Sequence, residues 1–208
     1  MELDHVLIAV VYLQAGARTL ETRHGLASVD GGRHAGWGTA NRIVPLGDTY
    51  VELITVVDEA EAAGSAFGRW VSAGIESAPG RPLGWVARTD RLDEVAARLG
   101  LAVSTGSRPA GDGRLLRWRL AGVDEAAAEP ALPFFVEWGE GTPLPGRTRI
   151  EHPAGTVRLE RLELGGDVGR VTEWLGIEGM PLSVTPGPPA VTGLVLASEQ
   201  GVWTIDRV

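Results

Sequence analysis

The sequence predicts an α+β fold built from repeated βαβββ modules with mixed, strongly curved sheets. Two observations predict it. The same order of elements recurs along the chain with a unit of about fifty residues, and two of the expected strands, "YVELI" and "FFVEW", each carry one Glu among apolar residues. With 208 residues and 44% hydrophobic residues, the chain is long enough for two or three such modules that share one core.

The first module is expected at residues 1–57. Its opening stretch "LDHVLIAV" is apolar apart from Asp4 and His5 and is typical of a buried strand. Gly25 follows a helical segment and is suited to close it. In order, we expect a strand at 3–10, a helix at 13–25, a Gly-rich loop at 27–38 and strands at 39–47 and 49–57.

A helical connection is expected at residues 58–82, because apolar residues recur there at helical spacing before the break "APGRP". The second module then occupies residues 83–140 and repeats the order of the first. In order, we expect a strand at 83–90, a helix at 91–100, a hairpin at 102–122 with its turn at Gly111 to Gly113, and a strand at 133–139.

Residues 141–208 are expected to form a linker and a partial third module, packed with the rest as one structural unit. The segment 157–166 alternates apolar and charged residues, which predicts a strand with one solvated face. A short helix at 168–176 and a closing hairpin of strands at 189–198 and 201–207 follow.

Composition excludes several classes of function. The absence of cysteine excludes disulfides and cysteine-ligated metals, and the absence of lysine excludes a Schiff-base lysine. The net charge of -8 and the lack of a basic stripe argue against nucleic acid as a partner. No apolar run reaches the length of a membrane span, and the N-terminus does not resemble a secretory signal. We therefore expect a cytoplasmic protein, from a GC-rich bacterium by its Ala, Gly, Pro and Arg usage.

The candidate metal-binding or catalytic residues are His5, Glu52 and Glu137, because each is ionisable and lies in an apolar strand. A buried carboxylate is costly unless it is paired or bound to a metal. One imidazole and two carboxylates form a nitrogen–oxygen set that suits Mn, Fe(II), Ni or Zn. The alternatives are that the histidine is structural, and that each glutamate lies on a solvated face or pairs with an arginine.

The order of the motifs resembles the vicinal oxygen chelate superfamily, and its glyoxalase-like branch in particular. Five stretches carry the resemblance: the opening "DHV" strand, the segment "HAGWGTANRIVPLG" (34–47), the strand with "YVELI" (49–54), the later "PFFVEW" (133–138) and "HP" (152–153). It covers most of the chain. It implies paired βαβββ modules whose sheets curl into a half-open barrel around a ligand cavity.

The resemblance also implies a metal site with one ligand from the first strand and one from the last strand of each module. His5 and Glu52 match the first pair, and Glu137 matches the end of the second. The fourth position falls near Gly84, where no ligand stands. Three protein ligands, a fourth ligand from elsewhere, or loss of the metal remain open. Glu52 and Glu137 are also the candidate catalytic bases.

Five further residues are candidates for substrate binding. His34 can reach the cavity mouth, and His152, in the linker, can fold back to supply the missing ligand, although a surface-loop role is the alternative for both histidines. Tryptophans near the candidate site can line a pocket or fill the core. The candidates are His34, Trp37, Asn41, Trp85 and His152.

The sequence therefore predicts a glyoxalase-like protein that acts on a small oxygen-bearing molecule with a divalent metal, which would be Zn, Mn, Fe, Ni or Mg. Lyase, isomerase and dioxygenase chemistry all agree with such a site. The alternative is a metal-free protein that binds or sequesters a small molecule in the same cavity. The sequence leaves open whether the chain acts as a monomer or as a homodimer.

Overall fold

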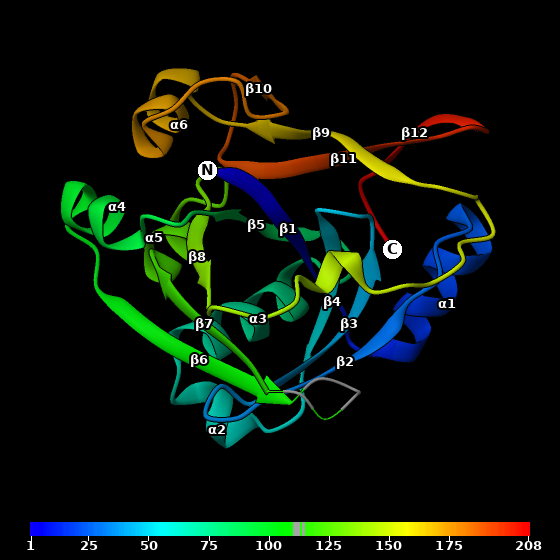
Figure 1. Ribbon diagram of the computed structural model, residues 1–208, viewed down its shortest axis with the longest axis horizontal. Coiled ribbons are helices and arrows are strands. Elements are labelled where there is room, and N and C mark those ends of the chain that lie inside the picture. Colours follow the sequence, from blue (N-terminus) through cyan, green and yellow to red (C-terminus); the bar gives the residue numbers. More distant parts are fainter. Residues whose placement is uncertain (110–112, 114) are drawn as a thin grey trace.

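The protein folds into two sheets, and its computed structural model describes residues 1–208 apart from 110–112 and 114. The larger sheet has eight strands in the order β2-β3-β4-β1-β5-β8-β7-β6, and the smaller has four in the order β10-β9-β11-β12. The larger sheet curls around an interior, and the smaller one lies across its outer side (Figure 1). The predicted α+β class with strongly curved mixed sheets is confirmed.

The first half of the large sheet contains one helix and four strands. They are β1 (Glu2–Ala9), α1 (Leu13–His24), β2 (Val29–His34), β3 (Thr39–Pro45) and β4 (Tyr50–Val56). Strands β2, β3 and β4 form an antiparallel meander, and β4 returns to lie parallel to β1. Helix α1 ends at Gly25, which has a φ of 63° and is left-handed as its sequence position predicts.

The second half repeats this arrangement. Its elements are β5 (Pro82–Arg88), α4 (Leu92–Leu99), β6 (Val103–Pro109), β7 (Leu115–Ala121), α5 (Val123–Ala128) and β8 (Phe134–Trp138). Strand β8 lies parallel to β5, as β4 does to β1. The antiparallel pairing of β1 with β5 joins the two halves into one sheet.

Two helices connect the halves: α2 (Glu59–Ala63) and α3 (Ala66–Ser77). Asp58 and Ser65 each accept a backbone N–H at the start of a helix, which satisfies a donor that the helix itself leaves unpaired. Helix α3 packs its apolar face into the concave side of the large sheet. The inner core that results includes Leu7, Ile54, Phe67, Trp70, Val86, Phe134 and Val136.

The C-terminal part covers the convex side of the large sheet. It contains a 3-10 turn at Pro145–Arg147, then β9 (Arg158–Gly165), α6 (Val168–Leu175), β10 (Leu182–Thr185), β11 (Ala190–Ser198) and β12 (Gly201–Ile205). Its apolar side chains form an outer core with the residues of the large sheet that face away from the interior. These include Leu162, Leu164, Leu194 and Leu196 together with Trp85, Ala87 and Phe135.

Several sequence expectations need correction. The Gly-rich segment 27–38 is not all loop, because β2 runs through it. Helix α5 and strand β10 were not expected. The hairpin at 102–122 forms, but most of the residues expected at its turn lie outside the described residues. The C-terminal part has the βαβββ order, yet its first strand pairs with β10 and β11, whereas in each half the first strand pairs with the last.

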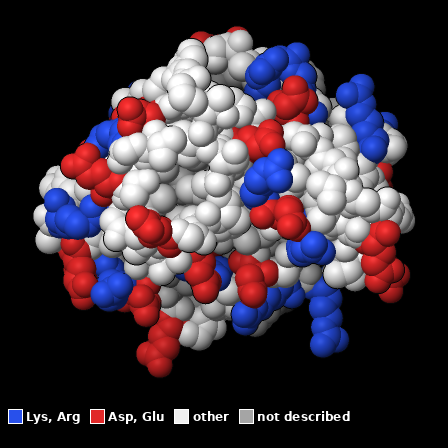
Figure 2. Space-filling model, turned by 90° about the horizontal axis from the view of Figure 1, so that it is seen from above, with Lys and Arg blue, Asp and Glu red and all other residues white. Residues whose placement is uncertain are grey.

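The surface carries charges of both signs. On the face shown in Figure 2, basic and acidic side chains alternate around a broad uncharged area. A face of this kind does not present the continuous basic stripe that nucleic acid requires. None of the helices in the described part of the chain has both the length and the apolar character needed to cross a membrane.

Candidate functional site

An irregularity in β1 sets the position of Asp4 and His5. In the pairing of β1 with β5, Leu3 lies opposite Ala87 and His5 opposite Val86, so Asp4 is an extra residue. Such a bulge turns the extra side chain out of the normal alternation. Both side chains are buried, and the His5 Nδ1 lies 2.7 Å from Asp4 Oδ1. The bulge thus places a carboxylate beside the imidazole within one strand.

Glu52 meets this imidazole from the neighbouring strand. Strands β1 and β4 are parallel, with His5 opposite Tyr50 and Leu7 opposite Glu52, so His5 and Glu52 lie on the same face. The His5 Nε2 is 3.1 Å from Glu52 Oε2. Asn41 Nδ2, on β3, donates a hydrogen bond to the other carboxylate oxygen. The structure thus brings two of the three predicted site residues, His5 and Glu52, into direct contact.

The two carboxylates fix the charge of His5. Burial favours the neutral ring, but the hydrogen bonds and negative charges of Asp4 and Glu52 outweigh it and raise the pKa of His5 to about 9. For Glu52, burial favours the neutral acid, but His5 outweighs it and lowers the pKa of the carboxyl well below its ordinary value. At neutral pH the site thus holds a buried imidazolium between two carboxylates.

Asp4 is held by three donors. Besides His5, it accepts hydrogen bonds from Trp138 Nε1 at 3.0 Å and from Arg88 Nη1 at 3.3 Å, both to Oδ2. Arg88 also pairs with Glu2 at the start of β1. Because Asp4 is tied on both oxygens, it can hold the His5 ring in one orientation with Nε2 directed at Glu52.

His34 lies on the other side of Glu52 and is neutral. Burial lowers the pKa of its ring to about 4. Its Nδ1 is 3.0 Å from Thr39 Oγ1, and its Nε2 is 3.4 Å from Asn41 Nδ2. Since Asn41 Nδ2 is a donor, Nε2 accepts and Nδ1 carries the hydrogen. The remaining amide oxygen of Asn41 is buried and has no hydrogen-bond partner among the described residues.

These polar residues border a small inner cavity of about 40 Å³. Its other walls are aromatic and apolar, and the His5 ring stacks on Tyr50 at 4.4 Å between centroids. The cavity has room for a polar head group or one to three waters. The residues that line it are His5, His34, Trp37, Asn41, Tyr50, Glu52, Phe67, Arg108, Trp118, Leu120, Phe134, Val136 and Trp138.

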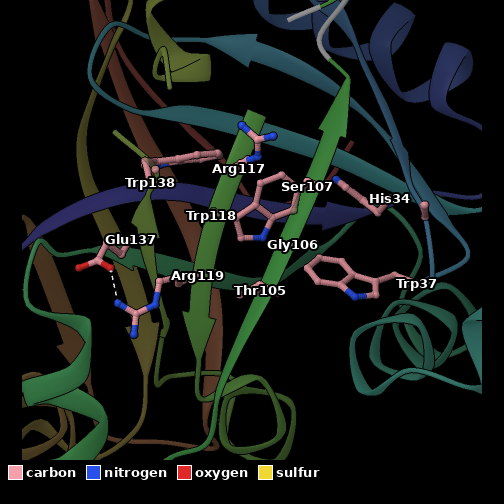
Figure 3. Close-up of a pocket in the computed structure, with 12 residues that line it drawn as sticks. His34, Trp37, Thr105, Gly106, Ser107, Arg117, Trp118, Arg119, Glu137 and Trp138 are labelled. Carbon is pink, nitrogen blue, oxygen red and sulfur yellow. Dashed lines mark hydrogen bonds and ion pairs between the residues drawn. The ribbon is translucent and has the colours of Figure 1, made fainter. Parts of the chain in front are cut away.

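An open cleft of about 470 Å³ adjoins the inner cavity (Figure 3). The two share four residues, His34, Trp37, Trp118 and Trp138. The Trp118 ring packs edge-on against Trp37 at 5.9 Å and against Trp138 at 5.7 Å between centroids. A molecule in the cleft would therefore contact indole rings on its way to the inner polar groups.

Glu137 does not join His5 and Glu52, which corrects the predicted three-residue site. Along β8 the residues Phe134, Val136 and Trp138 line the inner cavity, so Glu137 points away from that cavity, although it is among the residues that line the open cleft. There its Oε2 is 2.8 Å from Arg119 Nη1, an ion pair seen in Figure 3. The alternative of pairing with an arginine holds for this glutamate.

The strand pairing shows what occupies the equivalent places in the second half. His5 lies opposite Tyr50 in the β1–β4 pair, and Val86 lies opposite Phe134 in the β5–β8 pair. Val86 thus corresponds to His5, and Val136 to Glu52. Gly84 is no ligand position either, since a Cβ there would come within 2.5 Å of the Trp70 ring.

Two of the five substrate-binding candidates lie elsewhere. Trp85 is fully buried in the outer core, where its Nε1 donates to the Ala131 carbonyl. His152 accepts from the Ala27 N–H at 3.0 Å and donates to the Pro45 carbonyl at 2.7 Å, so it fastens the linker to the first half. His34, Trp37 and Asn41 do lie at the cavity, and their role in binding stays a prediction.

Some residues of the site were not identified from the sequence. Asp4 was visible in "LDHV", but nothing in the letters shows that a bulge turns it towards His5. Tyr50, Phe67 and Trp118 are apolar positions of ordinary strands and helices, which sequence patterns assign to the core. Arg108 stands in a segment rich in Gly, Ser and Pro that resembles a loop.

The residues present do not fit the metal site that the family resemblance implies. That site takes two ligands from each half, but the second half has Val86 and Val136 at the corresponding places. In the first half, His5 and Glu52 already bond to each other. Within the described part of the chain, no three His, Asp or Glu side chains are arranged to hold an ion.

The fold consists of paired βαβββ modules whose curved sheet encloses a small cavity. The chain belongs to the glyoxalase-like domain family, whose model matches residues 3–176. The resemblance seen in the sequence is thereby confirmed. No curated protein matches the chain.

Solved structures resemble the chain to different degrees. A hypothetical protein from Staphylococcus aureus is 15% identical, with a TM-score of 0.64 over 99% of this chain and 85% of that one. A methylmalonyl-CoA epimerase from Mycobacterium tuberculosis is 17% identical, with a TM-score of 0.46 over 66% of this chain and 86% of that one. The likeness to the Staphylococcus aureus protein concerns the fold alone, and nothing is inferred from the epimerase.

The two buried histidines should give the stability opposite dependences on pH. The pKa of His34 is lowered from 6.5 to about 4 on folding, so its contribution is complete above pH 6.5 and is lost as the pH falls towards 4. The pKa of His5 is raised from 6.5 to about 9, so its contribution is complete below pH 6.5 and is lost as the pH rises towards 9.

Urea unfolding between pH 4 and 9 measures both effects. We expect the free energy of unfolding to depend less on pH below 6.5, the acid limb, in the His34→Gln variant. In the His5→Gln variant it should depend less on pH above 6.5, the alkaline limb. His24, only partly buried at the end of α1, provides the control. Burial lowers its pKa to a smaller extent than that of His34, so His24→Gln should change the dependence of stability on acid pH less than His34→Gln does. Acid limbs of equal slope in wild type and His34→Gln would contradict the assignment.

Proposed function

We propose that the protein binds a small oxygen-bearing molecule with a flat apolar body, whose polar end contacts His5, Asn41 and Glu52. The observation that carries the proposal is the buried Asp4–His5–Glu52 chain at an aromatic-lined cavity. Burying two carboxylates and an imidazole is costly, and an apolar strand would fill the same space more stably. Perturbed, buried ionisable groups of this kind cluster at functional sites.

The volumes of the inner cavity and of the open cleft support a ligand with a small polar end and a larger apolar body. The inner cavity, at about 40 Å³, admits only a polar head group, whereas the cleft of about 470 Å³ admits a body of drug-like size. Asn41 borders the cavity, and its hydrogen bond to Glu52 holds its amide in place there. Trp37 and Trp118 offer flat rings against which an apolar body can pack.

Proton transfer on the bound molecule is a second candidate function, favoured by the direct contact of His5 with Glu52. In this reaction a C–H bond next to a carbonyl breaks, Glu52 takes the proton, and the electron pair moves onto the carbonyl oxygen as an enolate. Donors at the cavity would stabilise that oxygen. The low pKa of Glu52 keeps it ionised but makes it a weak base, so we expect slow turnover.

The metal-dependent lyase, isomerase or dioxygenase activity that the sequence predicts is less well supported by this site. A metal would have to break the His5–Glu52 contact and would gain only those two ligands from the strand positions that the family uses. We therefore assign no reaction step to a metal.

Binding can be measured by calorimetry with methyl phenylpyruvate, a neutral, flat, oxygen-bearing probe. We expect Trp37→Ala to weaken its binding about 5- to 10-fold, because one aromatic contact contributes about 1 kcal/mol. Trp37→Phe keeps a ring and should lose much less, and Trp203→Phe, on β12, should lose nothing. No detectable heat with wild type, or equal binding by Trp37→Ala, would contradict the proposal.

Metal binding can be tested with Zn²⁺ and Mn²⁺ added to protein purified without a tag or chelator. We expect neither ion to bind stoichiometrically at micromolar concentration, since two ligands make a weak site. Wild type and His5→Ala should then show the same small thermal shift. A tight one-to-one complex that His5→Ala abolishes would restore the metal-dependent function.

Proton transfer can be tested by deuterium exchange at the CH₂ group of phenylpyruvate in D₂O, followed by NMR. The two strand glutamates form a matched pair for this experiment. We expect wild type and Glu137→Gln to exchange deuterium faster than buffer alone. The rate catalysed by the protein should fall at least 100-fold in Glu52→Gln. Equal exchange by Glu52→Gln would exclude Glu52 as the base.

A further inference from the structure

Five ionisable residues line the inner cavity: His5, His34, Tyr50, Glu52 and Arg108. Burial raises the pKa of the Tyr50 hydroxyl, so this residue is neutral. His5 and Glu52 share one proton between their facing atoms and together contribute no net charge, whichever of them holds it. His34 is neutral, and a proton on it would add positive charge. Behind them, Asp4 and Arg88 also cancel. The ionisable residues that line the cavity, as far as the structure describes it, therefore carry one net positive charge, that of Arg108.

Arg108 is unusually placed for an arginine. It is only 5% exposed and comes from β6, at the far edge of the large sheet. Its Nη1 donates to the Gly31 carbonyl at 2.6 Å and to the Pro109 carbonyl at 3.3 Å. These bonds hold the guanidinium between β6 and β2, where the two edges of the curved sheet approach each other (Figure 1).

The glycines of β2 permit this approach. A Cβ on Gly32 would lie 3.0 Å from the Pro109 carbonyl oxygen and 3.4 Å from Arg108 Nη1. Gly32 also has a φ of 154°. A side chain at this position would push β6 away and carry the guanidinium out of the cavity wall. The glycines of this segment thus leave the space that the Arg108 side chain occupies.

A buried guanidinium facing a ligand cavity is best satisfied by an oxyanion. Its planar donors match a carboxylate in a fork that a neutral carbonyl cannot fill equally. The low polarity of the surrounding aromatic rings strengthens this attraction relative to water. A cationic ligand would be repelled by the same charge.

We propose that the ligand is a monoanion, a small carboxylate with a flat apolar body, and that Arg108 binds its carboxylate group. This inference rests on the proposed function, since it names the chemical class that the same cavity takes. The apolar body would lie against Trp118 and Trp37, and the carbonyl or hydroxyl oxygen next to the carboxylate would reach Asn41 and the His5–Glu52 pair.

The test compares phenylpyruvate with its methyl ester in calorimetry, because the ester removes the negative charge and adds only one methyl group. We expect wild type to bind the acid at least 10-fold more tightly than the ester. Arg108→Met should bind both about equally, with ester affinity close to that of wild type. Arg108→Lys should keep part of the preference, and Arg91→Met, an exposed arginine paired with Glu94, should keep all of it.

Each outcome decides the question. Equal binding of acid and ester by wild type, or a preference that survives in Arg108→Met, would overturn the inference while leaving the proposed function intact, because the ester would still bind. If neither compound binds, the proposed function fails and the inference fails with it. The comparison within wild type does not depend on the variants, so a misfolded Arg108→Met would not obscure the result.

Discussion

The contact between His5 and Glu52 is the interaction on which the candidate site depends. Neither group could be buried alone, because an uncompensated charge in the interior costs several kcal/mol. Each therefore requires the other, and each requires a further partner: Asp4 for the imidazole and Asn41 for the carboxylate. Removing the His5 ring would leave the buried Glu52 carboxylate without its cation, at a cost of about 3–5 kcal/mol. The bulge in β1 and the parallel pairing of β1 with β4 bring these groups together.

The two halves share their strand order but not the chemistry of their interiors. The first half carries His5 and Glu52 on its inner face, and the second carries Val86 and Val136 at the same places. The cavity is polar on one side and apolar on the other as a result. Such an interior suits a molecule with one polar end and one apolar end, and it is poorly suited to an ion that needs ligands from both sides.

The sequence predicts the order of elements well, because caps, glycines and apolar periodicity are local signals. It predicts side-chain direction less well. The strings "YVELI" and "FFVEW" align by letter, yet a shift of one residue turns every side chain of a strand to the opposite face. Pairing alone determines this register, and so Glu137 and Trp85 point away from the inner cavity. Long-range contacts such as those of His152 with Ala27 and Pro45 leave no local signal at all.

Direct titration of the His5 ring by NMR is the most direct test of the buried Asp4–His5–Glu52 chain. We expect a His5 pKa of about 9 in wild type and in Glu137→Gln, and a clearly lower one in Glu52→Gln, because Glu52 contacts the ring and Glu137 does not. A His5 pKa near or below 6.5, or one that Glu52→Gln leaves unchanged, would show that the chain of charges does not exist.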